Sequence, residues 1–375
     1  MQNIILMMKD TPVMRINTSN GLYDVLNFKL IPYQMKSIIW GMKLEEKDSY
    51  TRDELLKWQN ITIEKYELFI SFLSARVLTL DRKNAKKILM AFHLEQSQSK
   101  EYRAKVAIIC RAVSLQDNYW IKLEGEKERW SDVDIRQNSL SEVVAQVALH
   151  GSSLTLGGAV HTPELTTHGT YAKCWRRTRD GLYLYKRGGH NSEDSHIEVE
   201  VSNILDKTNV MHVKYYDAES RGKYCCKCKC MTTENISILS AMDFFTYCNR
   251  NGYSANSLMY SIDADSIYKM FIVDYLISNN DRHGMNWGFF YNCDTMDIIG
   301  CHPLFDHNGA FDEEALRKGV KYMFGNGRTL LQCAKTAITR VDFRFTDRIK
   351  KSDFYYKEHY KQFIERCAVL GLRTK

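Results

Sequence analysis

Three polar side chains in the last third of the chain are of the types that handle phosphate groups. Asp281 and Asn286 stand five residues apart in the polar run 279–286, and Asp306 follows within the run 303–309. A carboxylate can orient an attacking hydroxyl, and carboxylate and amide oxygens are the hard ligands that Mg²⁺ prefers. Phosphoryl transfer requires mostly this kind of positioning and charge neutralisation. The residue types therefore favour phosphoryl-transfer chemistry.

The spacing of Asp281 and Asn286 becomes informative only in its context. Kinase catalytic loops separate their base from their metal-binding Asn by the same interval. The isolated pattern is weak because Asp and Asn are common in turns, so residues 279–281 could simply cap the preceding helix. The apolar runs 287–291 and 298–300 flank a polar turn and predict a β-hairpin. Such a hairpin would bring Asp306 back beside Asn286.

A lysine and a glutamate farther upstream could complete a nucleotide site. Lys186 ends the predicted strand 182–185, and residues 195–205 form a helix-like run. Glu198 lies three and seven residues before Val201 and Leu205, so it shares their inward face, whereas Glu200 projects farther round the helix. We therefore expect Glu198 to hold Lys186 against nucleotide phosphates. The alternative for Lys186 is a solvated lysine at the end of a strand.

The run Asn-x-Asp-x-His-x-x-Asn at 279–286, followed by a strand pair and a late Asp, resembles the HipA-like serine/threonine kinases. Their fold is related to that of phosphatidylinositol kinases and, more distantly, of protein kinases. The resemblance covers about residues 150–350. It implies ATP and Mg²⁺ as cofactors, Asp281 as catalytic base, His283 as a support of the loop, and Asn286 and Asp306 as the ligands of Mg²⁺.

The phosphate-binding loop has no standard motif. Neither Gly-x-x-x-x-Gly-Lys-Ser/Thr nor Gly-x-Gly-x-x-Gly occurs, which argues against a P-loop ATPase. The resemblance implies a shorter loop at residues 166–173, in which Gly169 and Thr170 approach phosphate and Lys173 adds charge. It also makes Thr166, Thr167 and Thr170 candidates for regulatory phosphorylation. A plain turn between strands would explain the same residues.

The elements that must position these residues fall into three regions. We expect a mainly helical accessory module over 1–130, a β-rich kinase N-lobe over 131–235 and a helical C-lobe over 236–375. The fold class is therefore α+β, with a bilobal, protein-kinase-like architecture. Capping boxes at Thr51–Glu54 and Ser139–Glu142 and a possible cap at Asp81 mark helix starts. Asp180-Gly181 predicts a tight hairpin.

Composition limits the class of protein. The formal net charge of +7 permits nucleic-acid contact without requiring it, and no nucleic-acid-binding signature accompanies it. The N-terminus does not read as a signal peptide, and no apolar run is long enough to span a bilayer, so we expect a cytoplasmic protein. Of the 11 cysteines, four cluster at residues 225–230. A zinc site is possible there, but the spacing favours a strand of buried thiols.

The functional expectation is an ATP- and Mg²⁺-dependent serine/threonine protein kinase that phosphorylates a protein hydroxyl. The family includes toxins of toxin–antitoxin pairs, so an antitoxin or another regulatory protein is a candidate partner. Nucleic acid would be contacted only indirectly or through the N-terminal helices. Two alternatives stay open at this point. One is a pseudokinase or scaffold. The other is a metal-dependent phosphohydrolase that uses Asp281, His283, Asp306 and His307.

Overall fold

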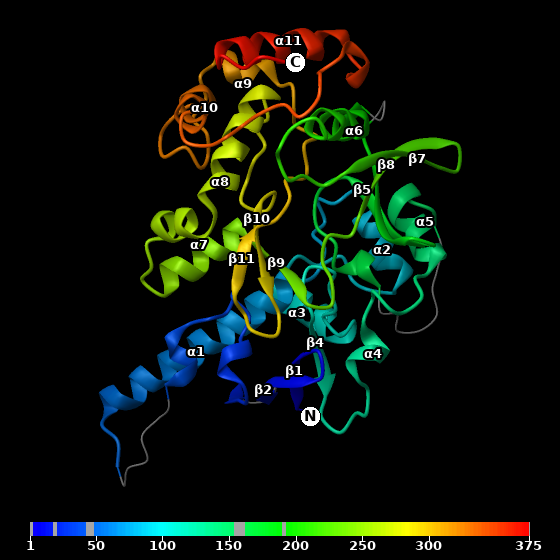
Figure 1. Cartoon of the computed structure of the whole chain (residues 1–375). Coiled ribbons are helices and arrows are strands. Elements are labelled where there is room, and N and C mark those ends of the chain that lie inside the picture. Colours follow the sequence, from blue (N-terminus) through cyan, green and yellow to red (C-terminus); the bar gives the residue numbers. More distant parts are fainter. Residues whose placement is uncertain (1–2, 18–20, 43–48, 154–161, 190–192, 375) are drawn as a thin grey trace.

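The computed structural model describes residues 3–17, 21–42, 49–153, 162–189 and 193–374. These residues form an N-terminal region, a β-rich lobe and a helical lobe (Figure 1). The N-terminal sheet lies at one end of the molecule, and the C-terminal helix α11 (Lys357–Val369) lies at the other, near α6 (Glu193–Leu205).

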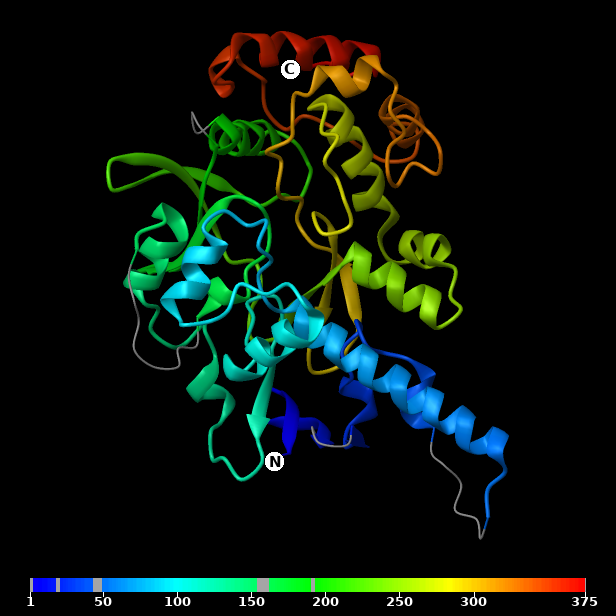
Figure 2. The same cartoon turned by 180° about the vertical axis from the view of Figure 1, so that it is seen from behind.

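The N-terminal region combines a sheet with helices. Its antiparallel sheet has the strand order β3-β2-β1-β4, so the last strand is added by a segment far along the chain. The sequence predicted a mainly helical module here, so this four-stranded sheet was not foreseen. Figure 2 shows α1 projecting away from the β-rich lobe, whereas α2 packs beside α5 (Glu142–His150). The elements are β1 (Ile4–Met8), β2 (Thr11–Asn17), β3 (Leu22–Val25), α1 (Arg52–Ala75), α2 (Ala85–Ala91), α3 (Lys100–Ile109) and β4 (Tyr119–Leu123).

The predicted helix starts have mixed outcomes. Thr51 and Glu54 form the expected capping box, in which the Glu54 amide donates to Thr51 Oγ1 over 3.2 Å. Asp81 does not cap α2. The cap is Asn84, whose φ of 67° lies in the left-handed region that Asn tolerates well. The capping box predicted at Ser139 is also wrong. Ser141 is the N-cap of α5, and its Oγ accepts the Val144 amide.

The β-rich lobe is built on a four-stranded antiparallel sheet with the order β5-β6-β8-β7. The predicted hairpin at Asp180-Gly181 joins β5 to β6, with Thr178 opposite Gly181. Helix α6 packs on β6, β7 and β8, and α5 packs on β5 and β6. The elements are α4 (Trp130–Val133), α5 (Glu142–His150), β5 (Ala172–Thr178), β6 (Gly181–Arg187), α6, β7 (Tyr215–Ser220) and β8 (Lys223–Lys229).

The helical lobe follows a connector at residues 230–235. Its three-stranded sheet has the order β11-β10-β9, and the predicted hairpin of residues 287–300 is its β10–β11 pair. Helix α8 leads into the polar run that carries Asp281. The elements are β9 (Ile236–Ser240), α7 (Ala241–Arg250), α8 (Ala255–Leu276), β10 (Gly288–Asn292), β11 (Ile298–Cys301), α9 (Glu313–Arg317), α10 (Leu330–Ala337) and α11.

Hydrogen bonds join the N-terminal region to the end of the connector and to β9. The Ile238 amide donates to the Gln116 carbonyl over 2.8 Å, and Asn118 Nδ2 donates to the Glu234 carbonyl over 2.7 Å. Asp117, between Gln116 and Asn118 in the chain, forms a buried two-point ion pair with Arg76 at 2.8 Å. The largest apolar cluster contains residues of both the N-terminal sheet and α8. The N-terminal region and the helical lobe therefore share one apolar core.

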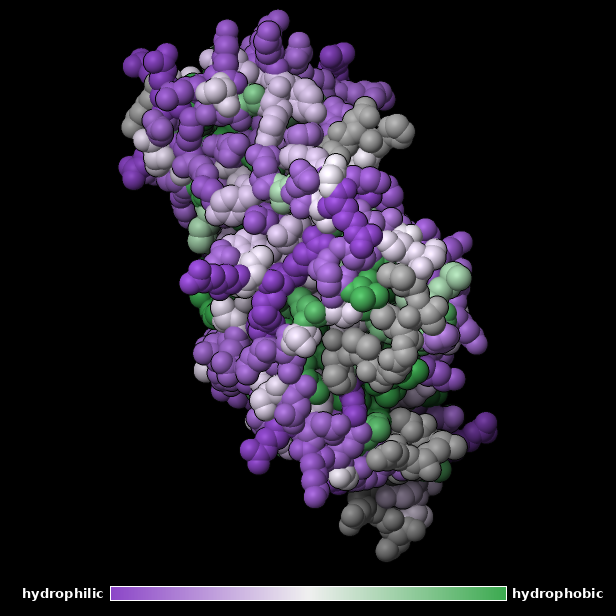
Figure 3. Space-filling model, turned by 90° about the vertical axis from the view of Figure 1, so that its right-hand side faces the viewer, coloured by the Kyte–Doolittle hydropathy of each residue, from purple (hydrophilic) through white to green (hydrophobic). Residues whose placement is uncertain are grey.

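The order of elements confirms the α+β class with a β-rich lobe before a helical lobe. The boundaries at residues 130 and 235 stay predictions. Cys225, Cys226 and Cys228 are buried on β8, and no group of three or more His, Cys, Asp or Glu side chains in the described residues is arranged to hold a metal ion. No described helix is long and apolar enough to cross a membrane. The face drawn in Figure 3 is mostly hydrophilic.

Candidate active site

A buried lysine joins the two lobes. Lys186, on β6, is 5% exposed and forms ion pairs with Glu198 of α6 and with Asp306 of the helical lobe. The distance from Lys186 Nζ to Asp306 Oδ1 is 2.6 Å. Glu198 also accepts the His307 amide at 3.0 Å. The expected pairing of Lys186 with Glu198 is present, and the contact with Asp306 was not foreseen.

The ionisable groups around Lys186 shift one another's pKa values. Burial opposes the ionised form of Asp306, but Lys186 and then Lys173 hold the pKa of this carboxyl well below its usual value. Burial also disfavours a charged Lys186, yet Asp306 and Glu198 raise its pKa well above the ordinary one. The arrangement therefore keeps a carboxylate and an ammonium in contact at any pH near neutrality.

The loop after α8 holds Asp281 at the surface by bonds among its own residues. Asn279 Oδ1 accepts the Asp281 amide at 3.2 Å, and the His283 amide donates to the Asp281 carbonyl at 2.9 Å. His283 Nδ1 accepts the Met285 amide at 3.2 Å. Asn286 Nδ2 donates to the Asp281 carbonyl at 2.9 Å, which leaves its Oδ1 as the amide atom that can bind a cation. His283 thus lies where a support of the loop would lie.

Arg282 is a site residue that sequence reasoning missed. Its guanidinium is fully buried, pairs with Asp274 of α8 at 2.9 Å and donates to the carbonyls of Asn286 and Phe305 at 2.9 and 2.7 Å. It thereby fastens the Asp281 loop to the segment that carries Asp306. A signal was available, because Asp274 recurs with the apolar residues of α8 and a buried acid needs a cationic partner.

The expected placement of the Asp306 side chain beside that of Asn286 stays a prediction. Arg282 joins the backbones of their two segments, while the carboxylate of Asp306 points to Lys186. Asp306 has a φ of 60°, in the left-handed region that non-glycine residues rarely adopt. Such strained residues are typical of functional sites. Asp306 and Asn286 therefore offer one ionised carboxylate and one amide oxygen, which suits Mg²⁺.

The segment 166–173 has features that fit a phosphate group. Gly169 is exposed with a φ of 97°, and a Cβ there would collide with Lys173 Nζ. Lys173 is 7% exposed and its amine has no ion pair in the described part of the chain. Burial and then the charge of Lys186 lower its pKa from the usual 10.5 to about 8. An incoming anion would neutralise the charge of Lys173.

The three threonines of this segment are not equivalent. Thr166 and Thr167 donate their hydroxyls to the Pro163 carbonyl, and Thr167 Oγ1 also accepts from Trp175 Nε1 at 3.0 Å. Thr170 is exposed, and its carbonyl accepts the Lys83 amide at 2.7 Å. Among the three candidates for phosphorylation, Thr170 has the accessible side chain.

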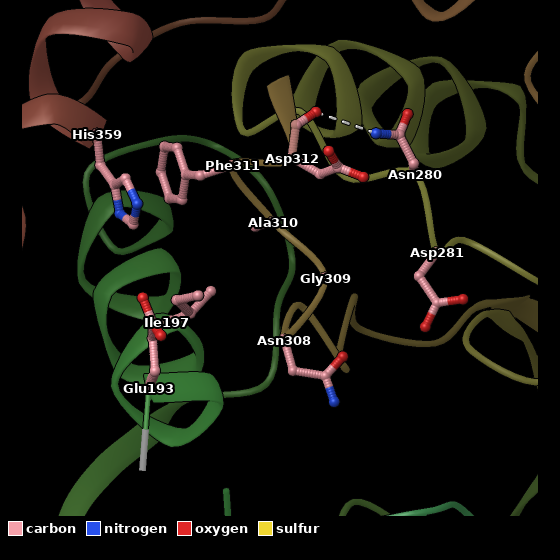
Figure 4. Close-up of a pocket in the computed structure, with 10 residues that line it drawn as sticks. All are labelled: Glu193, Ile197, Asn280, Asp281, Asn308, Gly309, Ala310, Phe311, Asp312 and His359. Atoms are coloured by element: carbon pink, nitrogen blue, oxygen red, sulfur yellow. Dashed lines mark hydrogen bonds between the residues drawn. The ribbon is translucent and has the colours of Figure 1, made fainter. Parts of the chain in front are cut away.

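A pocket of about 550 Å³ opens beside Asp281. Figure 4 shows Asp281 at one side of it and Glu193, at the start of α6, at the other. Lys186 and Asp306 do not line the pocket. Asn308, two residues after Asp306, does line it, so the pocket adjoins the ion pairs of Lys186. The lining residues are Glu193, Ile197, Asn280, Asp281, Asn308, Gly309, Ala310, Phe311, Asp312 and His359.

Comparison with known proteins gives similarities in structure alone. No protein-family profile matches the chain, and no curated protein matches it in sequence. One similar solved structure is HipA of the Shewanella oneidensis MR-1 toxin–antitoxin system, solved with HipB and operator DNA. It has a TM-score of 0.48 and 11% identity over 98% of each chain. Another similar solved structure is the Helicobacter pylori proinflammatory kinase CtkA, with a TM-score of 0.39 and 16% identity over 54% of this chain and 90% of that one.

Proposed function

We propose that this chain is an ATP- and Mg²⁺-dependent serine/threonine protein kinase of the HipA-like type. One observation carries the proposal. Lys186 is held at once by Glu198 of the β-rich lobe and by Asp306 of the helical lobe. In kinases a strand lysine paired with a helix Glu binds the nucleotide phosphates, and an Asp after the catalytic loop binds Mg²⁺.

The other residues take roles that follow from their positions. Asp281 is exposed in the pocket, where it can orient a hydroxyl and accept its proton. Lys186 and Lys173 would bind phosphate oxygens, and Gly169 leaves room for them. Asn286 and Asp306 would hold Mg²⁺, which supplies charge neutralisation to the transferred group. Arg282 keeps these parts in register.

The phosphohydrolase alternative has less support. Two-metal hydrolases gather several His and acidic side chains around their ions. His307 is buried, and its Nδ1 faces Arg282 Nη2 at 3.1 Å. In the described residues no group of three or more potential metal ligands converges. The site therefore fits a single nucleotide-bound cation better than a metal cluster.

Incubation of the purified protein with γ-labelled ATP, Mg²⁺ and a mixture of candidate proteins tests the proposal. We expect label on Ser or Thr of a protein, and we expect Asp281→Asn to lower the transfer rate by roughly 10²- to 10⁴-fold while ATP still raises the melting temperature. Asp297→Asn, in the exposed turn between β10 and β11, is the matched control. A melting shift by ATP without any transfer would favour the pseudokinase. The absence of both the melting shift and the transfer would refute the kinase proposal.

We also propose a toxin role, which rests on the resemblance of the catalytic loop, and a cytoplasmic location, which rests on the apolar pattern described under Sequence analysis. Expression of the wild-type chain in a bacterial host should then slow growth, and Asp281→Asn should not. Co-expression of a partner protein that relieves the arrest would identify an antitoxin. Equal growth with both forms at equal protein levels would reject the toxin role and leave the kinase proposal intact.

A further inference from the structure

Three carboxylates line the pocket beside Asp281. Glu193 begins α6, Asp281 lies in the loop after α8, and Asp312 caps α9. Two acids that follow Asp312 outside the pocket are paired, Glu313 with Arg366 and Glu314 with Lys318. None of the three pocket carboxylates has an ion pair within the described residues, and no Lys or Arg is among the side chains that line the pocket.

These carboxylates do not converge on one point. Asp281 and Glu193 lie on opposite sides of the pocket, and Asp312 lies near Asn280 (Figure 4). No group of three acidic or His side chains among the described residues is close enough to hold a single ion. The charge is thus spread over a cavity of about 550 Å³, which is room for side chains of an extended ligand.

Two stacked rings and one aliphatic side chain form the wall near Glu193 and Asp312. The rings of Phe311 and His359 stack with centroids 3.9 Å apart and an interplanar angle of 6°. His359 Nδ1 contacts Glu200 at 2.8 Å, so this nitrogen is engaged away from the pocket acids. Ile197 lies beside the ring pair. Long basic side chains place their methylenes on such surfaces and their charges beside carboxylates.

From these features we infer that the phosphate acceptor is a Ser or Thr hydroxyl in a polypeptide with Lys or Arg next to it. The inference rests on the proposed kinase function, because it places the acceptor hydroxyl at Asp281. The basic neighbour lies along Phe311 and reaches Glu193 or Asp312. Opposite charges across a contact select partners more than they add affinity, so the pocket sets specificity.

Synthetic peptides test the inference. Each peptide carries one Ser, flanked by Arg in one peptide and by citrulline in the other, because citrulline keeps the shape of Arg without its charge. With the wild-type chain we expect kcat/KM to be roughly tenfold higher for the Arg peptide, and added salt to reduce the ratio. Glu193→Gln and Asp312→Asn should each lower the ratio roughly threefold. Asn also caps helices well, so α9 should persist.

The control is Glu101→Gln, which removes an exposed acid at the start of α3, outside the pocket. It should leave the ratio unchanged. Equal rates for the two peptides, or an unchanged ratio in the double variant Glu193→Gln/Asp312→Asn, would overturn the inference while the kinase proposal stands. Autophosphorylation without transfer to either peptide would also overturn it. Loss of all transfer together with absence of an ATP-dependent melting shift would instead reject the kinase proposal itself.

Discussion

Arg282 and Asp274 form an ion pair in which both side chains are fully buried, with Nη2 2.9 Å from Oδ1. Burial works against the charge on Arg282, but Asp274 raises the pKa of the guanidinium above its usual value. Tyr322 donates a hydrogen bond to the same carboxylate. The pair stands behind the loop of Asp281 and the segment of Asp306, so both depend on it.

We predict that Asp274→Asn destabilises the chain by about 3–5 kcal/mol, because Arg282 is left as a buried charge without its partner. Urea unfolding followed by circular dichroism measures this free energy. The control is Asp342→Asn, which breaks an exposed pair with Arg344 and should change stability little. The prediction fails if the two variants unfold at the same urea concentration.

Lys186→Met should weaken productive use of the nucleotide. Its ammonium is the contact common to Glu198 and Asp306, and its loss leaves two carboxylates facing each other. We expect kcat/KM for ATP to fall on the order of 10²- to 10³-fold, as for loss of other charge-stabilising groups. Lys229→Met, at the exposed end of β8, is the matched change on the same sheet. A comparable loss in both variants would contradict the special role of Lys186.

Lys173 should make ATP use sensitive to pH. Burial and Lys186 lower its pKa to about 8, so the amine loses its charge as pH rises through that value. We expect kcat/KM for ATP to decline above pH about 8, because a neutral amine attracts phosphate less. Lys173→Arg, which stays charged, should flatten the profile. A wild-type profile that is flat from pH 7 to 9.5 would contradict the prediction.

The lowered pKa of Lys173 affects stability in the opposite direction: rising pH weakens ATP use but favours the folded state. Between pH about 8 and 10.5 the unfolded chain still holds the proton that folded Lys173 has released. The contribution of Lys173 to the free energy of unfolding therefore rises with pH across this window. Comparison of wild type with Lys173→Met by urea unfolding at pH 7.5 and 10 isolates it. A gap between the two proteins that does not change with pH would argue against the shift.

Glu200 should position α6 for catalysis without touching the nucleotide. It is fully buried, accepts the Tyr355 amide at 3.1 Å and contacts His359 of α11 at 2.8 Å. Glu200→Ala leaves these groups unpaired and should lower stability by about 1–3 kcal/mol. At a temperature where the variant is folded, kcat should still be reduced, because α6 also carries Glu198.

Glu365→Ala, an exposed change on α11, is the control for Glu200. A purely structural role for Glu200 would reduce the melting temperature and leave kcat of the folded enzyme at the wild-type value. That outcome would contradict a positioning role.

The sequence by itself determined the features that depend on neighbouring residues. The Thr51 capping box, the turn at Asp180-Gly181 and the β10–β11 hairpin follow from local backbone preferences. Helical periodicity was enough to choose Glu198 over Glu200 as the partner of Lys186, because one face of α6 must turn toward the sheet. Local rules reach only as far as one element or one turn.

Only the tertiary structure decided which distant charges meet. Asp306 contacts Lys186 across 120 positions of the chain, and Glu200 turns to His359 of the C-terminal helix. Strand β4 joins β1 to complete a sheet that the N-terminal residues alone do not predict. Such pairings depend on how buried charges and sheet edges are satisfied once the whole chain has packed, and no local pattern encodes them.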